Sequence, residues 1–353
     1  MRLDPKNQRW TWRMASSGIG LQRMQDTENS AWQHSMQNAV RSVSELLDCL
    51  GLRPEDFPSP IDSENPFPLF VPREFIARMN PGDPTDPLLL QILPTKEERV
   101  QTLGYQRDPV GDEYVERAPG LLHKYSSRVL MIASGVCAVH CRYCFRRHFP
   151  YDEAPRSNDQ WKPTLEIIAN DPSIHEVILS GGDPLSLGNP RLKALGNALE
   201  SIDHVQRLRI HTRFPVMIPN RIDPEFCEWL ASSRLTSWVV LHINHANEVD
   251  DALSQSIRAM KRSGASVLNQ AVLLRGINDT VALQRDLCER LVDVGVQPYY
   301  LHQLDRVDGA AHFETPNPVG EQIIDELRKL LPGYAVPRLV REVSGEPHKT
   351  VLR

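Results

Sequence analysis

The chain has 353 residues, a formal net charge of −5 and a sequence pI near 6.2. This length exceeds that of a usual single hydrophobic core, so it predicts two domains or one α/β barrel with an extension. The acidic balance argues against an extended face that binds nucleic-acid phosphates. Residues 1–17 include an acidic side chain and lack the apolar centre of a secretory signal. No apolar run approaches the roughly 20 residues that span a bilayer, so we expect a cytoplasmic protein without membrane or nucleic-acid partners.

The N-terminal region, residues 1–110, changes character along its length. Residues 1–50 have apolar positions in a helical pattern, whereas the segment from Pro54 to Pro109 contains eleven prolines. Proline lacks a backbone donor and fixes φ, which disfavours long helices and central strands. The pattern predicts short helices around residues 72–79 and 95–103, joined by extended segments. Interspersed apolar side chains indicate that the region wraps on a larger body rather than forming a flexible linker.

From residue 128 onward, short runs rich in β-branched residues alternate with amphipathic stretches. This alternation is typical of parallel βαβ units. Six such units predict an α/β fold, a partial (β/α)6 TIM-like barrel over residues 111–335, followed by a C-terminal segment over residues 336–353. The predicted strands are 128–133, 175–180, 207–212, 238–243, 266–274 and 298–304, the predicted helices are 164–171, 190–202, 223–233, 251–264, 280–295 and 320–331, and a last extended run is 336–343.

Polar residues follow the predicted strands at their carboxyl ends, where the active sites of α/β barrels gather. Three cysteines follow the first strand, SGGDPL (180–185) follows the second, and HTRFP (211–215) follows the third. We therefore expect the six strands to converge on one polar site. The residues near the ends of the other three strands are His242 and Asn244, Asn269 and Gln270, and Gln303 and Asp305.

Cys137, Cys141 and Cys144 follow the first strand with the spacing C-x3-C-x2-C. In a cytoplasmic protein, clustered cysteines usually serve metal or redox chemistry rather than disulfides. A structural zinc site needs a fourth ligand, which His140 or His148 would provide. A four-iron cluster held by three cysteines instead leaves one iron open to a further ligand. The other cysteines lie in helical patterns and are predicted to be small buried side chains, namely Cys49, Cys227 and Cys288.

The cysteine segment, which includes CRYCFRRHFPY (141–151), resembles the cluster loop of radical S-adenosylmethionine (SAM) enzymes, whose fold is a full or partial (β/α) barrel. The resemblance implies a [4Fe–4S] cluster bound by the three cysteines, with SAM bound at the open iron and cleaved there by electron transfer. It also implies that Gly181, Gly182 and Asp183 of the GGDP sequence meet the methionine part of SAM. Two adjacent glycines permit a close backbone approach to a ligand.

A narrower resemblance covers roughly residues 55–350. SGGDPLSL, RIHTRFPVMIPNRI, LHINHANEV, NQAVLLRGINDT and YYLHQLD together resemble lysine 2,3-aminomutase and its relatives. The resemblance implies pyridoxal 5′-phosphate (PLP) as a third cofactor, tethered as a Schiff base by Lys349 of the GEPHKT sequence. It implies phosphate contacts from Lys124, Tyr125 and Arg128 of HKYSSR. The family more often has arginine at position 124, and a lysine neutralises phosphate only as a point charge.

The same resemblance implies how a substrate amino acid is held while its nitrogen moves from C2 to C3. Arg146 matches the clamp for the α-carboxylate, and Asp305 and Glu342 match positions that receive a distal ammonium group. Two carboxylates there favour L-lysine over glutamate, although the family's lysine enzymes more often have aspartate at position 342. The remaining matched positions are His242 and Gln270, which contact SAM in the family, and Arg213 and Asn244, to which we assign no role.

The chain ends four residues after Lys349, and this short form resembles the bacterial aminomutases that take part in maturation of elongation factor P. That resemblance implies conversion of L-lysine to (R)-β-lysine, which a separate synthetase-like ligase attaches to elongation factor P. It also implies a flavodoxin or ferredoxin as the electron donor. Three alternatives stay open: an aminomutase for glutamate or another amino acid, a radical enzyme without PLP, and a non-catalytic protein that binds zinc or a cluster.

Overall fold

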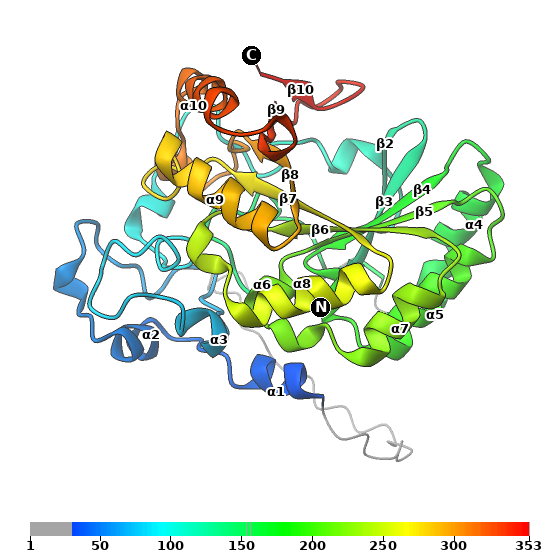
Figure 1. Ribbon diagram of the computed structural model, residues 1–353, viewed down its shortest axis with the longest axis horizontal. Helices are drawn as coiled ribbons and strands as arrows, with labels where there is room; N and C mark the ends of the chain where they lie inside the picture. The colour runs from blue at the N-terminus through cyan, green and yellow to red at the C-terminus, as the bar shows by residue number, and fades with distance from the viewer. Residues whose placement is uncertain (1–29, 153, 156, 353) are drawn as a thin grey trace, which may run out of the picture. The chain divides into compact units, whose positions relative to one another are not determined.

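The computed structural model describes residues 30–152, 154–155 and 157–352, and Figure 1 shows its ribbon. Ala31–Arg353 form one compact unit. The helical prediction for residues 1–29 lies outside the described residues. The boundaries predicted near residues 110 and 335 stay a prediction.

One ten-stranded sheet, in the order β1 to β10, forms the centre of this unit. Strands β3 to β9 run parallel, while β1 and β2 at one edge and β10 at the other are antiparallel to their neighbours. The two edges make the sheet a partial barrel, which confirms the predicted fold class. The strands are β1 (Glu116–Ala118), β2 (Leu121–Tyr125), β3 (Arg128–Ser134), β4 (Glu176–Gly181), β5 (Arg207–Thr212), β6 (Thr236–His242), β7 (Ser266–Val272), β8 (Gln297–His302), β9 (Arg338–Arg341) and β10 (Thr350–Val351).

All six predicted strands are present, with each end within two residues of its expected place. Their interiors are largely buried, which explains their continuous apolar runs, because parallel strands are covered on both faces. The extended run at residues 336–343 contains β9, which joins the parallel set. The short edge strands β1, β2 and β10 were not expected, since they are brief and carry charged or polar residues.

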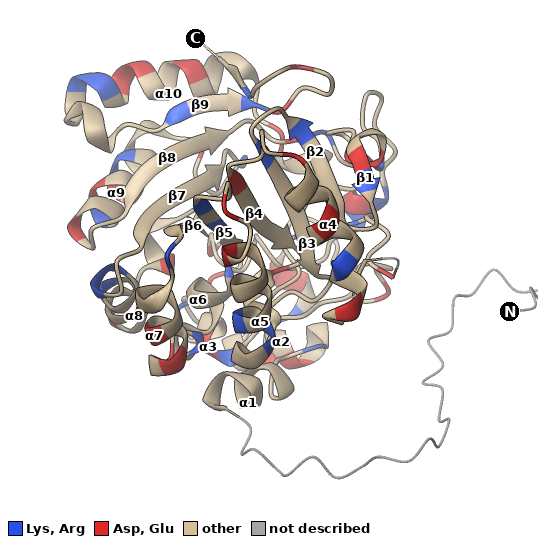
Figure 2. Cartoon of the chain, turned by 90° about the vertical axis from the view of Figure 1, so that its right-hand side faces the viewer, with Lys and Arg blue, Asp and Glu red and all other residues tan. Residues whose placement is uncertain are grey.

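Helices connect the parallel strands and cover the outer side of the sheet (Figure 1). Each predicted helix is present, and the short α6 (Phe214–Met217) is additional. Charged positions lie on outward turns of α9 and α10 (Figure 2). In the part of the chain that the structure describes, no helix combines the length and apolarity needed to cross a membrane. The connecting helices are α4 (Lys162–Asn170), α5 (Asn189–Glu200), α7 (Pro224–Ser232), α8 (Asp251–Arg262), α9 (Val281–Asp293) and α10 (Asn317–Leu330).

The extension before the barrel contains short helices, as its prolines predict. These are α1 (Ala31–Gln37), α2 (Val43–Leu50) and α3 (Arg73–Ile76), with a 3-10 turn at Lys96–Arg99. The helices predicted around residues 72–79 and 95–103 thus exist but are shorter than expected. The extension is anchored rather than linker-like, because many of its apolar side chains are buried, with Phe75, Leu88, Leu89 and Ile92 fully so.

The three cysteines of helical segments differ in burial. Cys288 on α9 is buried as predicted, whereas Cys227 on α7 is half-buried and Cys49 on α2 is exposed. The prediction of burial was therefore wrong for Cys49. Helix α2 buries the face that carries Leu46, Leu47 and Leu50, so Cys49 lies on the other side.

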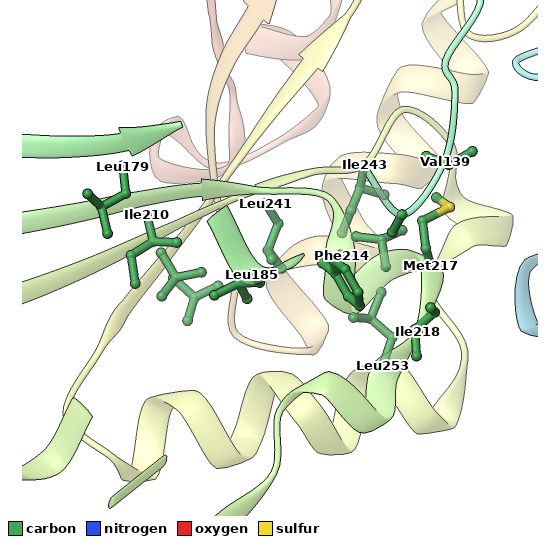
Figure 3. Close-up of a cluster of buried hydrophobic side chains, with 14 of the residues drawn as sticks. Val139, Leu179, Leu185, Ile210, Phe214, Met217, Ile218, Leu241, Ile243 and Leu253 are labelled. Carbon is green, nitrogen blue, oxygen red and sulfur yellow. The ribbon is translucent and has the colours of Figure 1, made fainter. Parts of the chain in front are cut away.

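The hydrophobic core extends from the sheet to the cysteine loop, residues 135–151 (Figure 3). Leu179 of β4, Ile210 of β5 and Leu241 of β6 pack in the same cluster as Phe214, which follows β5. Val139 also belongs to this cluster and is 4 % exposed. Because Val139 lies between the first and second cysteines of the loop, its burial fixes the loop against the barrel.

Candidate active site

A cavity of about 640 Å³ lies inside the partial barrel. Side chains from strands β2 to β9, the cysteine loop and the C-terminal segment line it. All of the predicted site residues line this one cavity, as do Arg213 and Asn244. Asn269 and Gln303, which were also expected at the polar mouth, are instead buried in hydrogen bonds to the backbone at Ile243 and Thr315.

The cysteine loop is held by the proline-rich extension. The backbone N–H of His140 donates to Phe70 O at 3.0 Å, and that of Arg142 donates to Gln91 O at 2.9 Å. The Arg142 guanidinium adds a hydrogen bond to Phe67 O at 2.8 Å. The extension therefore positions the loop that carries the three thiols.

Glu98 of the extension is the carboxylate at the centre of this clamp. It is 8 % exposed and accepts hydrogen bonds from Arg142, at 2.8 and 2.5 Å, and from Arg147 at 2.6 Å. In the sequence, Glu98 is one of several charged residues in the polar stretch KEER. Its spacing from Thr95 marks it only as a helix-capping residue, which accepts from Thr95 N–H at 3.2 Å. Only the distant arginines show that it also holds the cysteine loop.

A second buried network lies behind Cys141. Arg213 places Nη1 at 2.8 Å from Cys141 Sγ and donates through Nη2 to Glu248 Oε2 at 2.9 Å. Asn244 donates to the Tyr143 hydroxyl at 2.6 Å, which also accepts from Arg213. Arg213 and Asn244, to which the sequence assigned no role, therefore fix the middle of the cysteine loop.

The three thiols are close enough to influence each other. Burial raises the pKa of Cys137 well above its ordinary value, and the neighbouring charges of Cys144, Asp183 and Cys141 raise it further. Burial likewise raises the pKa of Cys144 to about 11, with Cys141 adding to the effect. Thiols with raised pKa values stay protonated until a metal ion binds the sulfur atoms and displaces the protons.

The zinc alternative finds no support in the described residues, since no three His, Cys, Asp or Glu side chains among them converge on a point suited to one ion. His140 Nδ1 lies 2.8 Å from Pro68 O, and His148 Nε2 lies 3.2 Å from Asp308 O. Each imidazole thus has one ring nitrogen at a backbone carbonyl. Three thiols that bind separate irons of a cluster need not converge on one point.

The glycine sequence after β4 packs directly on the cysteine loop. Gly182 N–H donates to Ser134 O at 2.7 Å, and Asp183 N–H donates to Val136 O at 2.8 Å. A Cβ at Gly181, whose φ is +119°, would lie 2.4 Å from Ser134 O, and one at Gly182 would lie 2.7 Å from Val136 O. Both positions therefore require glycine for this close backbone approach.

The Asp183 side chain faces the end of β5. It accepts four hydrogen bonds, from Leu185 N–H, Thr212 Oγ1, Arg213 N–H and Phe214 N–H, at distances between 2.7 and 3.0 Å. Burial raises the pKa of Asp183 to about 6 even though these donors favour the carboxylate. The Asp183 side chain therefore joins the loop after β4 to the loop after β5.

Histidines of β5, β6 and β8 line the cavity. His242 Nε2 lies 2.8 Å from Gln270 Nε2, and its ring meets that of His211 edge-on at 6.0 Å. Burial, with the charges of Arg213 and Arg146, lowers the pKa of His242 to about 3, so the ring is neutral. Buried Nε2 atoms of His211 and His302 have no hydrogen-bond partner among the described residues. Unpartnered buried polar atoms are costly, and here they face a space where a polar ligand would satisfy them.

Alternating charges cross the cavity from Arg146 to Lys349. Arg146 donates to Asp112 at 2.8 Å, and Lys124 lies 3.1 Å from the other oxygen of Asp112. Lys124 also lies 3.7 Å from Glu342, and the Lys349 amine donates to Glu342 at 2.5 Å. A continuous row of alternating charges thus links Arg146, the predicted carboxylate clamp, to Lys349, the predicted PLP lysine. The row between them consists of Asp112, Lys124 and Glu342.

Asp112 is a site residue that sequence reasoning missed. It is 2 % exposed. Burial opposes its ionisation, but the charges of Arg146 and Lys124 outweigh burial and lower its pKa. Its place in the irregular stretch before β1 offered no signal. Glu342, in turn, is approached by Lys349, by Lys124 and by the Tyr125 hydroxyl at 2.8 Å, so in this structure the chain's own groups surround it.

Asp305 and Arg128 lie in different surroundings. Burial raises the pKa of Asp305 to about 7, with Lys349 acting against the shift and Glu342 adding to it. Arg128 places its guanidinium 4.2 Å from the centre of the Tyr125 ring. Lys124 lies near the carboxylates of Asp112 and Glu342, and its predicted contact with phosphate stays a prediction.

The open parallel sheet and the three-cysteine loop define the class of protein. Residues 131–281 match the radical SAM superfamily. This span begins in β3 and contains the cysteine loop, the glycine sequence and both His242 and Gln270.

The relatives define the family. The chain is 45 % identical over 92 % of its length to an L-lysine 2,3-aminomutase of Haemophilus influenzae, covering 96 % of that protein. It is 45 % identical over 91 % of its length to that of Escherichia coli, covering 94 % of it, and 32 % identical over 92 % to that of Clostridium subterminale, covering 78 %. The chain therefore belongs to the lysine 2,3-aminomutase family of radical SAM enzymes and is an isomerase.

Membership of this family implies a [4Fe–4S] cluster, SAM and PLP, and the cavity suits all three. Three thiols lie on one anchored loop for the cluster. The glycine sequence packs against the cysteine loop on the wall of this cavity, and the unpartnered Nε2 atoms of His211 and His302 there would be satisfied by a polar ligand such as SAM. The half-buried Lys349 amine reaches the same cavity and is placed to tether PLP.

Proposed function

We propose that the chain is a PLP-dependent aminomutase that converts L-lysine to (R)-β-lysine. The observation that carries this proposal is that one cavity is lined by the three cysteines, by Lys349, and by carboxylates between them. When bound, the cluster with SAM would supply one-electron hydrogen abstraction, and PLP would supply a conjugated ring that delocalises the unpaired electron while the substrate nitrogen moves from C2 to C3. Cys137, Cys141 and Cys144 would hold the cluster, and Lys349 would hold PLP.

The residues of the chain then bind and orient the substrate. Arg146 donates hydrogen bonds to Asp112 at 2.8 Å and to Ser180 at 3.2 Å. These two bonds fix the orientation of its guanidinium group. A planar guanidinium held in this way suits an α-carboxylate. Where the protein supplies no acid or base, positioning of the substrate provides much of the rate enhancement.

Charge selects the distal end of the substrate. Asp305 has no hydrogen-bonded cation of its own among the described residues, and Glu342 carries a second negative charge into the same cavity. Both carboxylates attract the ε-ammonium of lysine and repel the side chain of glutamate.

An anaerobic reconstitution tests this function. The protein is loaded with iron, sulfide and PLP, given SAM and a reductant, and supplied with L-lysine or L-glutamate, after which chiral derivatives of the products are separated. We expect (R)-β-lysine from lysine alone. Lys349→Ala should abolish both product and the visible imine absorbance, while Lys329→Ala, on the surface of α10, should change neither. Product from glutamate alone would refute the substrate assignment.

We further infer that the product serves the modification of elongation factor P, with a flavodoxin or ferredoxin as the electron donor. The support is the resemblance of HKYSSR, CRYCFRRHFPY and GEPHKT to segments of the aminomutases with that role. A coupled assay with the β-lysine ligase and elongation factor P should give β-lysylated factor, detected by intact mass. Product formation without any transfer to the factor would contradict this role and leave the aminomutase reaction in place.

A further inference from the structure

Arg213 places a positive charge directly against the sulfur of one of the three clustered cysteines. It follows β5, and its Nη1 donates to Cys141 Sγ at 2.8 Å. The Arg213 side chain is 6 % exposed and lies against the rings of Phe75 and Tyr143, whose centres are each 5.7 Å from its guanidinium carbon. Arginine is not deprotonated in proteins. The charge at this sulfur is therefore permanent and is kept apart from solvent.

The counter-charge of Arg213 is bound by its other terminal nitrogen. Nη2 donates to Glu248 Oε2 at 2.9 Å and to Gln91 Oε1 at 2.6 Å. Glu248 is fully buried, and its Oε1 accepts from the backbone N–H groups of Asn244 and His245 at 2.9 and 3.1 Å. Gln91 Nε2 also donates to this oxygen, at 3.2 Å. The guanidinium thus bridges the sulfur and the carboxylate, and Glu248 keeps three hydrogen bonds that do not involve Arg213.

A permanent charge at a cysteine sulfur affects the electron affinity of a cluster that this cysteine binds. Reduction by one electron adds one negative charge to the cluster, so a nearby cation and an N–H···S hydrogen bond stabilise the reduced form. Hydrogen bonds to the sulfurs, net charge and solvent exposure set the reduction potentials of iron–sulfur clusters. In a buried site these interactions are weakly screened, so Arg213 and Glu248 should act on the cluster in opposite directions.

We propose that Arg213 raises the reduction potential of the cluster through Cys141 and that Glu248 limits this rise. The pair thereby sets how readily the cluster accepts an electron from a protein donor. The inference concerns the cluster alone, so it goes beyond the proposed function and depends neither on PLP nor on the substrate. If Arg213 served only to anchor the cysteine loop, its replacement would leave the potential of an assembled cluster unchanged.

The midpoint potential of the cluster tests the inference without any turnover. The full-length protein is reconstituted anaerobically with iron and sulfide, its iron content is measured, and the reduced cluster is followed by electron paramagnetic resonance during a mediated redox titration without SAM or PLP. Arg213→Gln should make reduction about tenfold less favourable, as expected for a lost charge-assisted hydrogen bond, which is a fall of about 59 mV for one electron. Arg213→Lys keeps the charge and should lose less.

Glu248→Gln should raise the potential, because it removes the negative charge and keeps Arg213. The double variant Arg213→Gln/Glu248→Gln should lie between the two single variants. A matched control is Arg73→Gln/Glu45→Gln, which removes one charge of each sign from an ion pair on α3 and α2. These side chains are 54 % and 43 % exposed, so solvent screens their charges and the control should keep the potential of the unaltered protein.

Equal potentials in the unaltered protein, Arg213→Gln and Glu248→Gln would overturn the inference and leave Arg213 with a structural role only. If Arg213→Gln assembles no cluster, Glu248→Gln decides the question, because it retains the guanidinium at Cys141. A raised potential in Glu248→Gln would then support the inference, and an unchanged or lowered potential would overturn it.

Discussion

Both carboxylate oxygens of Glu98 accept hydrogen bonds from the guanidinium of Arg142, the residue that follows the second cysteine of the cluster loop. The Arg142 side chain is fully buried, and that of Glu98 is 1 % exposed. A carboxylate of the proline-rich extension thus neutralises an arginine that the cysteine loop carries into the interior. The extension is in this way part of the cluster site.

Glu98→Gln should destabilise the protein by about 3–5 kcal/mol, because it leaves two buried arginines without their counter-charge. Iron bound per chain after reconstitution should fall in parallel. Urea unfolding and iron analysis measure the two effects. Glu97→Gln is the control and should change neither quantity, because among the described residues the Glu97 carboxylate accepts a hydrogen bond only from Ser59, at an exposed position. Equal iron contents in the two variants would contradict a role for Glu98 at the loop.

Asp112→Asn should raise the KM for lysine about tenfold to a hundredfold, because Arg146 and Lys124 lose the carboxylate that orients them. We expect kcat to fall less than kcat/KM, since Asp112 positions the clamp and does not touch the substrate. Asp112→Glu should restore part of the loss. Steady-state kinetics with lysine measure the effect, and a fall in kcat alone would argue for a different role.

Lysine binding should strengthen as the pH rises through about 7. Burial raises the pKa of Asp305 to about 7, so the group is protonated and uncharged below that pH and ionised above it. An ionised carboxylate attracts the ε-ammonium of lysine, which keeps its charge until about pH 10. The pH profile of kcat/KM should therefore have an ascending limb near 7.

Asp305→Asn should remove this limb and weaken lysine binding at pH 8. Asp325→Asn, in an exposed pair with Arg328 on α10, provides the control and should keep the limb. An unchanged profile in Asp305→Asn would assign the limb to another group.

Gly182→Ala should weaken SAM binding and cost about 1–3 kcal/mol of stability, because the added methyl group would lie 2.7 Å from Val136 O. Backbone atoms of the cysteine loop would have to move, which displaces the thiols as well as the glycine sequence. Equilibrium dialysis with SAM measures the loss. Gly333→Ala, which meets no atom within 4 Å, should bind SAM normally, and normal binding by both variants would contradict the close approach.

Local patterns were sufficient for the parallel strands β3 to β8 and for the cysteine loop, but not for the short antiparallel strands β1, β2 and β10. The runs of β-branched residues predict the ends of β3 to β8 to within two residues of the observed ends. This is possible because hydrophobic periodicity is a property of neighbouring positions in the chain. The carboxylates Glu98 and Asp112 carry no such signal. Their partners lie 44 and 34 residues away, and a buried acidic residue resembles a solvated one when only its neighbours in the chain are considered.

The sequence by itself determined which chemical groups are present and roughly where they stand on the strands: three thiols, a glycine pair, a C-terminal lysine and two carboxylates. Only the tertiary structure decided how their charges are paired. It directs Lys124 to Asp112 and Glu342, brings Lys349 to Glu342, and stacks Arg128 on the Tyr125 ring. The physical reason is that ion pairing in a buried cavity depends on distance and on the low local dielectric, and neither is encoded in the spacing of residues along the chain.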